Sequence, residues 1–242
     1  MLPDRPLRAV IMGIKENVAQ VRERVAAACR RSRREPDDVK LVAISKTFPP
    51  ECIRAAYDAG LRDFGENRVQ EAQAKRPALS DLSITWHLVG HLQTNKARAA
   101  RELFQWIHAV DSFRLAQKLD QAASPGAGRL LVLLEVNLGG EEGKAGVGET
   151  EITLLAEQVS RLAMLELRGL MVIPPFFDDS ERVRPYFRRL RELAREIDGS
   201  NIPNVSMREL SMGMSHDFEV AIEEGSTVVR VGTAIFGARG GV

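Results

Sequence analysis

The sequence predicts an α/β fold: a single (β/α)8 TIM barrel with an extra N-terminal helix. Its 242 residues suit one barrel domain. Short apolar runs alternate with helical patterns, and about eight such runs are present, the number of strands that closes this barrel. The glycine fingerprint of dinucleotide-binding sheets is missing after the first run, where Ser45, Lys46 and Thr47 stand instead.

The expected elements follow one another without a linker. Residues 1–36 form a helical extension, with apolar side chains at helical spacing over 8–33 and a break at Pro36. Strands are predicted at 39–45, 62–66, 84–90, 105–111, 129–138, 167–174, 209–213 and 228–236. Helices are predicted at 50–59, 67–76, 93–102, 112–122, 150–163, 181–197 and 216–224. We therefore expect residues 1–242 to form one domain, with an open doubly wound sheet as the main alternative.

Composition limits the classes of partner. The formal net charge of +1 gives no bulk attraction to nucleic acid or membranes, and the arginines between residues 30 and 34 close a helix, where cations favour the dipole. Cys29 and Cys52 are too few for a disulfide framework or a cysteine-based metal site. No signal peptide or membrane-length apolar stretch is present. We expect a cytoplasmic protein without a metal.

Polar residues gather where the predicted strands end. In barrels of this type the active site is built at the C-terminal ends of the strands. Those positions are Lys46, Glu66 with Asn67, His91, Asp111 with Ser112, Asn137, Ser211 with Ser215, and Arg230 with Thr233.

Lys46 directly follows the first strand, so its amine is expected at the mouth of the barrel. A lysine amine that is desolvated or lies near another cation becomes a nucleophile that condenses with aldehydes. Schiff-base formation is the natural use of such a lysine. The alternative is a lysine that extends from a strand end into solvent.

The last two loops offer a place for an anion. Barrels often bind phosphate with the loops after strands 7 and 8, where glycines let backbone N–H groups approach. Residues 211–215 (SMGMS) and the pair Gly232-Thr233 occupy these positions. Taken singly, they are also ordinary loop glycines and a serine N-cap.

Arg230 lies inside the apolar run of the eighth strand, where its guanidinium must find an acceptor. The acceptor is either a bound ligand or a buried carboxylate such as Glu66 or Glu135.

Several segments together carry a recognisable pattern. They are 41–46 (LVAISK), 64–71 (FGENRVQE), 86–90 (WHLVG), 93–96 (QTNK), 167–171 (LRGLM), 210–215 (LSMGMS) and 229–237 (VRVGTAIFG). In this order, over roughly residues 40 to 240, they resemble the YggS/PROSC family of pyridoxal phosphate homeostasis proteins. The barrel of that family is similar to the N-terminal barrel of alanine racemase.

The resemblance implies pyridoxal 5′-phosphate as cofactor, held by Lys46 as a Schiff base (an aldimine). It implies Asn67 near the cofactor ring and Arg230 near the pyridine nitrogen. It also implies a set of residues around the phosphate: Ser211, Gly213, Ser215, Gly232 and Thr233. His91 departs from the proline often found there in the family, and the glycine-rich segment 137–148 suggests a loop that carries Lys144 over the mouth.

Three functions use such a site. The resemblance implies a cofactor carrier in vitamin B6 and amino-acid homeostasis, a monomer that passes pyridoxal phosphate to apo-enzymes. An amino-acid racemase is the first alternative, and two features rank it lower. An arginine at the pyridine nitrogen weakens the cofactor ring as an electron sink. Racemisation also needs a second base, and the two tyrosines, Tyr57 and Tyr186, fall in predicted outer helices away from the mouth. The second alternative is a Schiff-base aldolase acting on a sugar phosphate. We therefore expect a carrier without catalytic residues, in which Lys46 only holds the cofactor.

Overall fold

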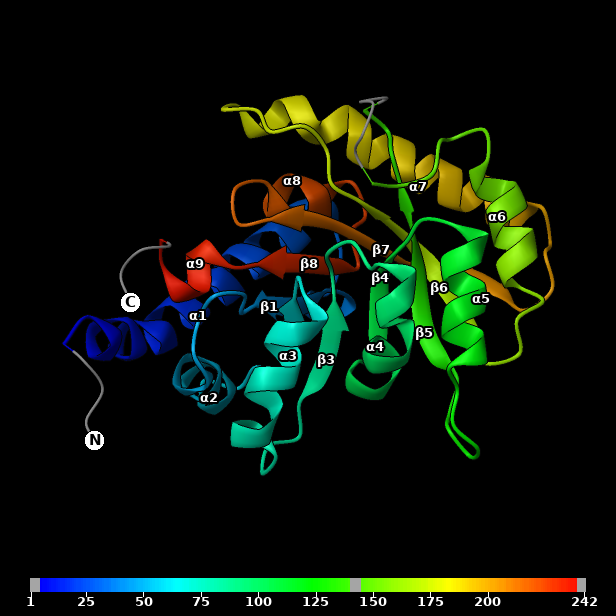
Figure 1. Ribbon diagram of the computed structural model, residues 1–242. Coiled ribbons are helices and arrows are strands. Elements are labelled where there is room, and N and C mark those ends of the chain that lie inside the picture. The colour runs from blue at the N-terminus through cyan, green and yellow to red at the C-terminus, as the bar shows by residue number, and fades with distance from the viewer. Residues whose placement is uncertain (1–4, 140–144, 239–242) are drawn as a thin grey trace.

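The computed structural model describes residues 5–139 and 145–238. Within them, eight parallel strands close into a barrel in which each strand pairs with the next along the chain and the last pairs with the first (Figure 1). This closure confirms the predicted (β/α)8 barrel over an open sheet. The strands are β1 (Lys40–Ile44), β2 (Asp63–Glu66), β3 (Thr85–Leu88), β4 (Trp106–Val110), β5 (Leu130–Val136), β6 (Leu165–Val172), β7 (Val205–Met214) and β8 (Val228–Val231).

The predicted bounds differ most at the last two strands. β7 begins earlier than expected because Val205 already pairs with Leu167 of β6. β8 ends at Val231, short of the predicted residue 236, because Thr233–Phe236 form the short helix α9. A short apolar run does not by itself distinguish a strand from a buried helical turn.

Helices surround the barrel (Figure 1). The N-terminal helix α1 (Arg5–Ser32) packs against α2, α8 and α9, and it buries Ile14, Val18 and Val21, which recur at helical spacing. No described helix has both the length and the apolar character needed to cross a membrane. The other helices are α2 (Pro50–Asp58), α3 (Val69–Lys75), α4 (Ala97–Leu103), α5 (Phe113–Gln121), α6 (Ile152–Val159), α7 (Arg184–Gly199), α8 (Phe218–Glu223) and α9.

The inside of the barrel is polar as well as apolar. His87 on β3, His108 on β4 and Ser211 on β7 are fully buried, and Arg230 on β8 is buried among them. Buried polar groups are costly unless they are hydrogen-bonded, so such an interior needs a connected set of partners. These partners define both the site and the layer beneath it.

Candidate functional site

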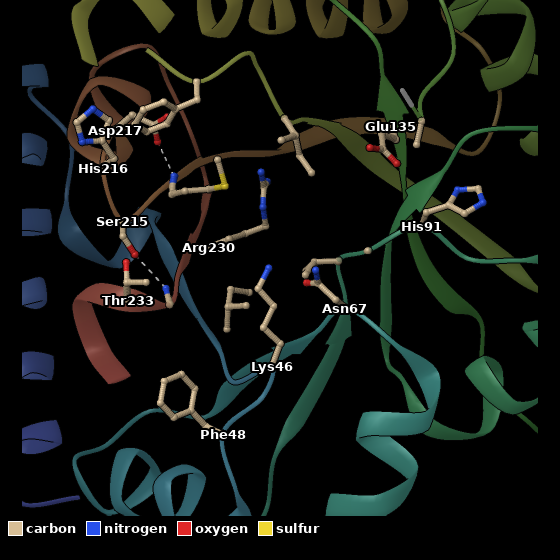
Figure 2. A pocket seen from close by; sticks show the side chains of 18 residues that line it. Lys46, Phe48, Asn67, His91, Glu135, Ser215, His216, Asp217, Arg230 and Thr233 are labelled. Carbon is tan, nitrogen blue, oxygen red and sulfur yellow. Dashed lines mark hydrogen bonds between the residues drawn. The ribbon is translucent and has the colours of Figure 1, made fainter. Parts of the chain in front are cut away.

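A cavity of about 650 Å³ opens at the C-terminal ends of the strands (Figure 2). This volume lies within the usual range for sites that bind small ligands. The family resemblance implied eight residues around the cofactor. Six of them line this cavity: Lys46, Asn67, Ser215, Arg230, Gly232 and Thr233. Strand ends far apart in the chain are thus brought to one place by closure of the barrel.

Lys46 rises into this cavity between Arg230 and Asn67 (Figure 2). The chain turns sharply behind it: Thr47 has a φ of 68°, and the N–H of Phe48 donates to the carbonyl of Ser45 at 3.1 Å. A left-handed conformation is costly for a β-branched residue, and it is held here by a hydrogen bond from the Thr47 N–H to Glu71 Oε2 at 3.1 Å. This turn directs the lysine inward, so extension into solvent is not what the structure shows.

A buried ion pair secures the strand end beneath Lys46. Glu66 Oε1 accepts hydrogen bonds from Ser45 Oγ and Lys75 Nζ, each at 2.7 Å, and Lys75 Nζ also donates to the carbonyl of Ser45 at 2.8 Å. Burial raises the pKa of Glu66 to about 7, although Lys75 favours the charged form. The ends of β1 and β2 are therefore tied together directly below the amine.

Arg230 forms the floor of the cavity and is only 4% exposed. Its NH1 group donates to Ser211 Oγ at 2.7 Å and its NH2 group to the carbonyl of Val172 at 3.0 Å. Within residues 5–139 and 145–238, no carboxylate lies within 4.0 Å of the guanidinium, so the ion pairs with Glu66 or Glu135 considered from the sequence do not form there. Burial lowers the pKa of Arg230 to about 10, which leaves the side chain charged at neutral pH.

Ser215 joins the last two loops at the edge of the cavity. Its Oγ accepts hydrogen bonds from the backbone N–H groups of Gly232 at 3.1 Å and Ala234 at 3.3 Å, where α9 begins. The lining residues Ser215 and Thr233 lie side by side there (Figure 2). These contacts hold the end of β7 against the start of α9, beside Thr233 at the edge of the cavity.

Ser211 and Gly213, the other two residues singled out from the sequence, lie outside the lining of the cavity. Ser211 is fully buried below Arg230. Gly213 has a φ of 93°, and a Cβ there would lie 2.6 Å from Ala221 Cβ and 2.9 Å from Phe218 Cα. The structure therefore shows Gly213 allowing α8 to pack closely against the end of β7.

Asn67 and His91 lie on the side of the cavity formed by β2 and β3. A Cβ at Gly90 would approach the backbone oxygen of Asn67 to 2.5 Å, so only glycine allows this contact. His91 is exposed on the rim, with Nδ1 3.2 Å from Asp111 Oδ2. The predicted loop residue Lys144 lies outside the residues that the structure describes.

Glu135 is a lining residue that the sequence reasoning did not select for the site. It is 6% exposed, and its Oε2 has no hydrogen-bond partner among the described residues. Burial, followed by the charge of Asp111, raises the pKa of Glu135 to about 7. The available signal was a lone carboxylate within the apolar run 130–136. Other lining residues also missed were Phe48, Phe176, His216 and Asp217.

Comparison with known proteins agrees with this architecture. Residues 14–240 match the family described as alanine racemase, N-terminal domain. A pyridoxal phosphate homeostasis protein from Aquifex aeolicus is 47% identical over 94% of this chain and 99% of that protein. One from Pseudomonas aeruginosa is 46% identical over 93% of this chain and 96% of that protein.

Solved structures show the same similarity. PipY of Synechococcus elongatus, in a structure with PLP bound, is 44% identical, with a TM-score of 0.79 over 90% of this chain and 100% of that chain. Alanine racemase from Corynebacterium glutamicum is 17% identical, with a TM-score of 0.69 over 94% of this chain and 61% of that chain. The second likeness concerns the fold alone.

Proposed function

Because the chain belongs to the family of the pyridoxal phosphate homeostasis proteins, within the alanine racemase N-terminal domain family, we propose that it binds pyridoxal 5′-phosphate in the cavity at the barrel mouth. Lys46 holds the cofactor as a Schiff base in this proposal. The observation that carries it is the convergence of Lys46, Arg230 and Gly232 on one cavity.

The residues of the cavity fit the two chemical ends of this cofactor. When bound, pyridoxal phosphate supplies an aldehyde that condenses with a primary amine, and Lys46 is the lysine in the described lining. Its phosphate is a compact anion, for which we propose Ser215, Gly232 and Thr233 at the last two loops. Asn67 lies beside Lys46 and is proposed to contact the ring (Figure 2).

Ser211 and Gly213 complete the proposed set without lining the cavity. Ser211 accepts the hydrogen bond from Arg230, and Gly213 permits the close approach of α8. Their proposed contribution is to shape the floor and the last loops.

Arg230 favours a carrier over a racemase. A guanidinium only donates hydrogen bonds, so a pyridine nitrogen placed against Arg230 stays unprotonated and withdraws electrons weakly. Racemisation also needs acid and base groups on both faces of the substrate. Tyr57 lies on α2 and Tyr186 on α7, and neither lines the cavity.

We therefore propose that the chain acts in vitamin B6 and amino-acid homeostasis as a monomeric cytoplasmic carrier. It keeps a reactive aldehyde bound and releases the cofactor to apo-enzymes. Residues 1–242 form one cofactor-binding domain in this proposal.

The test compares wild type with Lys46→Ala after each protein is incubated with pyridoxal phosphate. Wild type should gain an absorption band near the visible edge that borohydride bleaches, and its intact mass should rise by one reduced cofactor. Lys46→Ala should show neither change, whereas Lys118→Ala, which removes an exposed lysine on α5, should behave as wild type. A coloured, reducible Lys46→Ala protein would contradict the assignment.

The same material separates the alternatives. A wild-type protein that stays colourless with the cofactor, yet is trapped by borohydride on a sugar phosphate, indicates an aldolase. If the protein is coloured, incubation with single L-amino acids and chiral analysis of the products distinguishes a racemase from a carrier.

A further inference from the structure

A chain of polar side chains runs through the barrel interior beneath the cavity. Arg230 NH1 lies 2.7 Å from Ser211 Oγ, and Ser211 Oγ lies 2.8 Å from His108 Nδ1. His108 Nε2 lies 3.0 Å from His87 Nδ1, and His87 Nε2 lies 2.9 Å from Asp63 Oδ1. The chain connects the floor of the cavity with the first residue of β2, at the opposite end of the barrel.

The middle of this chain is fully removed from solvent. His87, His108 and Ser211 have no exposed surface, whereas the Asp63 side chain is 24% exposed. The Trp106 ring stacks on His87 with the centroids 5.8 Å apart. Burial lowers the pKa of both histidines, so each ring is neutral at neutral pH and carries one N–H.

The chemistry of its two ends gives the chain a direction. A guanidinium only donates, so Ser211 Oγ accepts from Arg230 and retains its own hydroxyl proton for His108 Nδ1. His108 must then donate from Nε2 to His87 Nδ1. His87 in turn donates from Nε2 to Asp63, since an ionised carboxylate only accepts.

The opposite direction would leave groups unsatisfied. His108 Nδ1–H would become a second donor to Ser211, whose proton would then need another acceptor. The lone pair of His87 Nε2 would also face a carboxylate oxygen. Buried groups left in this way are costly, so a single order of donors satisfies every member.

We infer that Asp63, His87 and His108 are positioning residues for Arg230. Together with Ser211, they hold the Arg230 guanidinium in one orientation through a directed series of hydrogen bonds, in which both imidazoles are in the Nε2–H form. The orientation matters for the cofactor only if the proposed function holds. The chain itself is a property of the barrel without cofactor.

Other charges surround the chain without interrupting it. Lys40 on β1 lies over the Trp106 ring at 4.4 Å, and its charge lowers the pKa of both imidazoles. Glu209 on β7 acts in the opposite sense on His87. At the other end, the charges of Asp217 and Glu135 favour the cationic form of Arg230.

The first test determines the tautomers in cofactor-free wild type by long-range ¹H–¹⁵N correlation NMR. The whole protein has four histidines, so the variants His91→Gln and His216→Gln are sufficient to assign the NMR signals of His87 and His108 as a pair. Both should be neutral Nε2–H forms between pH 7 and 8, above the ordinary histidine pKa of about 6.5, which burial lowers at both rings. An Nδ1–H form or an imidazolium at either position overturns the directed chain.

The second test measures the dissociation constant of pyridoxal phosphate for two replacements of His108. His108→Asn places an amide oxygen near the former Nδ1 and keeps an acceptor for Ser211, whereas His108→Leu removes it. We expect about tenfold weaker binding for His108→Leu and a loss within about threefold for His108→Asn, from the value of a hydrogen bond in a charged network. Ile107→Ala controls for lost stability, since Ile107 is buried against the outer helices.

The outcomes separate the positioning role of His108 from the proposed binding of pyridoxal phosphate. Equal affinity of folded His108→Leu and wild type, or an equal loss in Ile107→Ala, overturns the positioning role. Should His108→Leu fail to fold, the tautomers of wild type still decide the direction of the chain. Failure of wild type to bind the cofactor refutes the proposed function and leaves the NMR test intact.

Discussion

Two buried glutamates behave differently in this barrel, although burial raises the pKa of each to about 7. Glu66, at the end of β2, accepts hydrogen bonds from Lys75 and Ser45 and ties two strand ends together. Glu135, on β5, lines the cavity, and the nearby charge of Asp111 raises its pKa further. Similar pKa values therefore accompany different roles, and the hydrogen-bond partners identify which carboxylate supports the fold.

The largest effect is expected from Lys75→Met, which leaves Glu66 buried without its cation. Removing one partner of a buried ion pair typically costs about 3 to 5 kcal/mol. The free energy of unfolding from urea titration should fall by this amount at pH 8 and by less at pH 5, where Glu66 is protonated. Arg98→Met, which breaks an exposed pair with Glu102, is the control and should change little. If the free energy of unfolding fell by a similar small amount in Lys75→Met and Arg98→Met, the buried pair of Lys75 and Glu66 would be no more important to stability than an exposed pair.

A smaller effect of opposite sign is expected from Glu135→Gln. The pKa of Glu135 is raised from 4.5 to about 7 in the folded protein, so between these values the folded state binds more protons than the unfolded state. Wild-type stability is therefore lost as pH rises through this window, by roughly 3 kcal/mol from this group. Glu135→Gln should gain stability over wild type at pH 8 but not at pH 4.

Glu66→Gln is the matched comparison, since it removes the carboxylate 2.7 Å from Lys75 Nζ, leaves only Glu71 Oε2 at 3.8 Å, and should lose stability at pH 8. Urea titrations of the three proteins at both pH values measure the difference. A loss of stability in Glu135→Gln at pH 8 would show that Glu135 is as firmly paired as Glu66.

The smallest effect is expected from Ser45→Ala. The Ser45 hydroxyl donates to Glu66 Oε1, and loss of a hydrogen bond to a charged group costs about 1 to 2 kcal/mol. Thermal unfolding should show this loss, while Ser80→Ala, whose exposed hydroxyl bonds only to the Pro77 carbonyl among described groups, should leave stability close to wild type. No change in Ser45→Ala would mean that Lys75 alone accounts for the stabilisation of Glu66.

The sequence was informative about Lys46 for a local reason. A lysine that directly follows a buried parallel strand must emerge at the C-terminal edge of the sheet, whichever strands are its neighbours. The same reasoning placed Ser215, Gly232 and Thr233 at the last two loops, and the structure brings all four to one cavity.

Sequence reasoning was less informative about residues inside the strands. Ser211 and Ser215 are separated by only three residues, yet one lies under Arg230 and the other at the mouth, because β7 extends to Met214 and its register with β8 shifts between Ser211 and Met214. A register shift changes which face a side chain occupies, and a periodic pattern does not reveal it.

Local pattern alone determined the alternation of strands and helices, the strand count and the polar strand ends, because hydrophobic periodicity and chain direction are properties of neighbouring residues. Only the tertiary structure decided the partners of Arg230, the pairing of Glu66 with Lys75 and the line of side chains from Asp63 to Ser211. Those contacts join strands that are distant in the chain, and they depend on how each strand is registered against the next when the sheet closes.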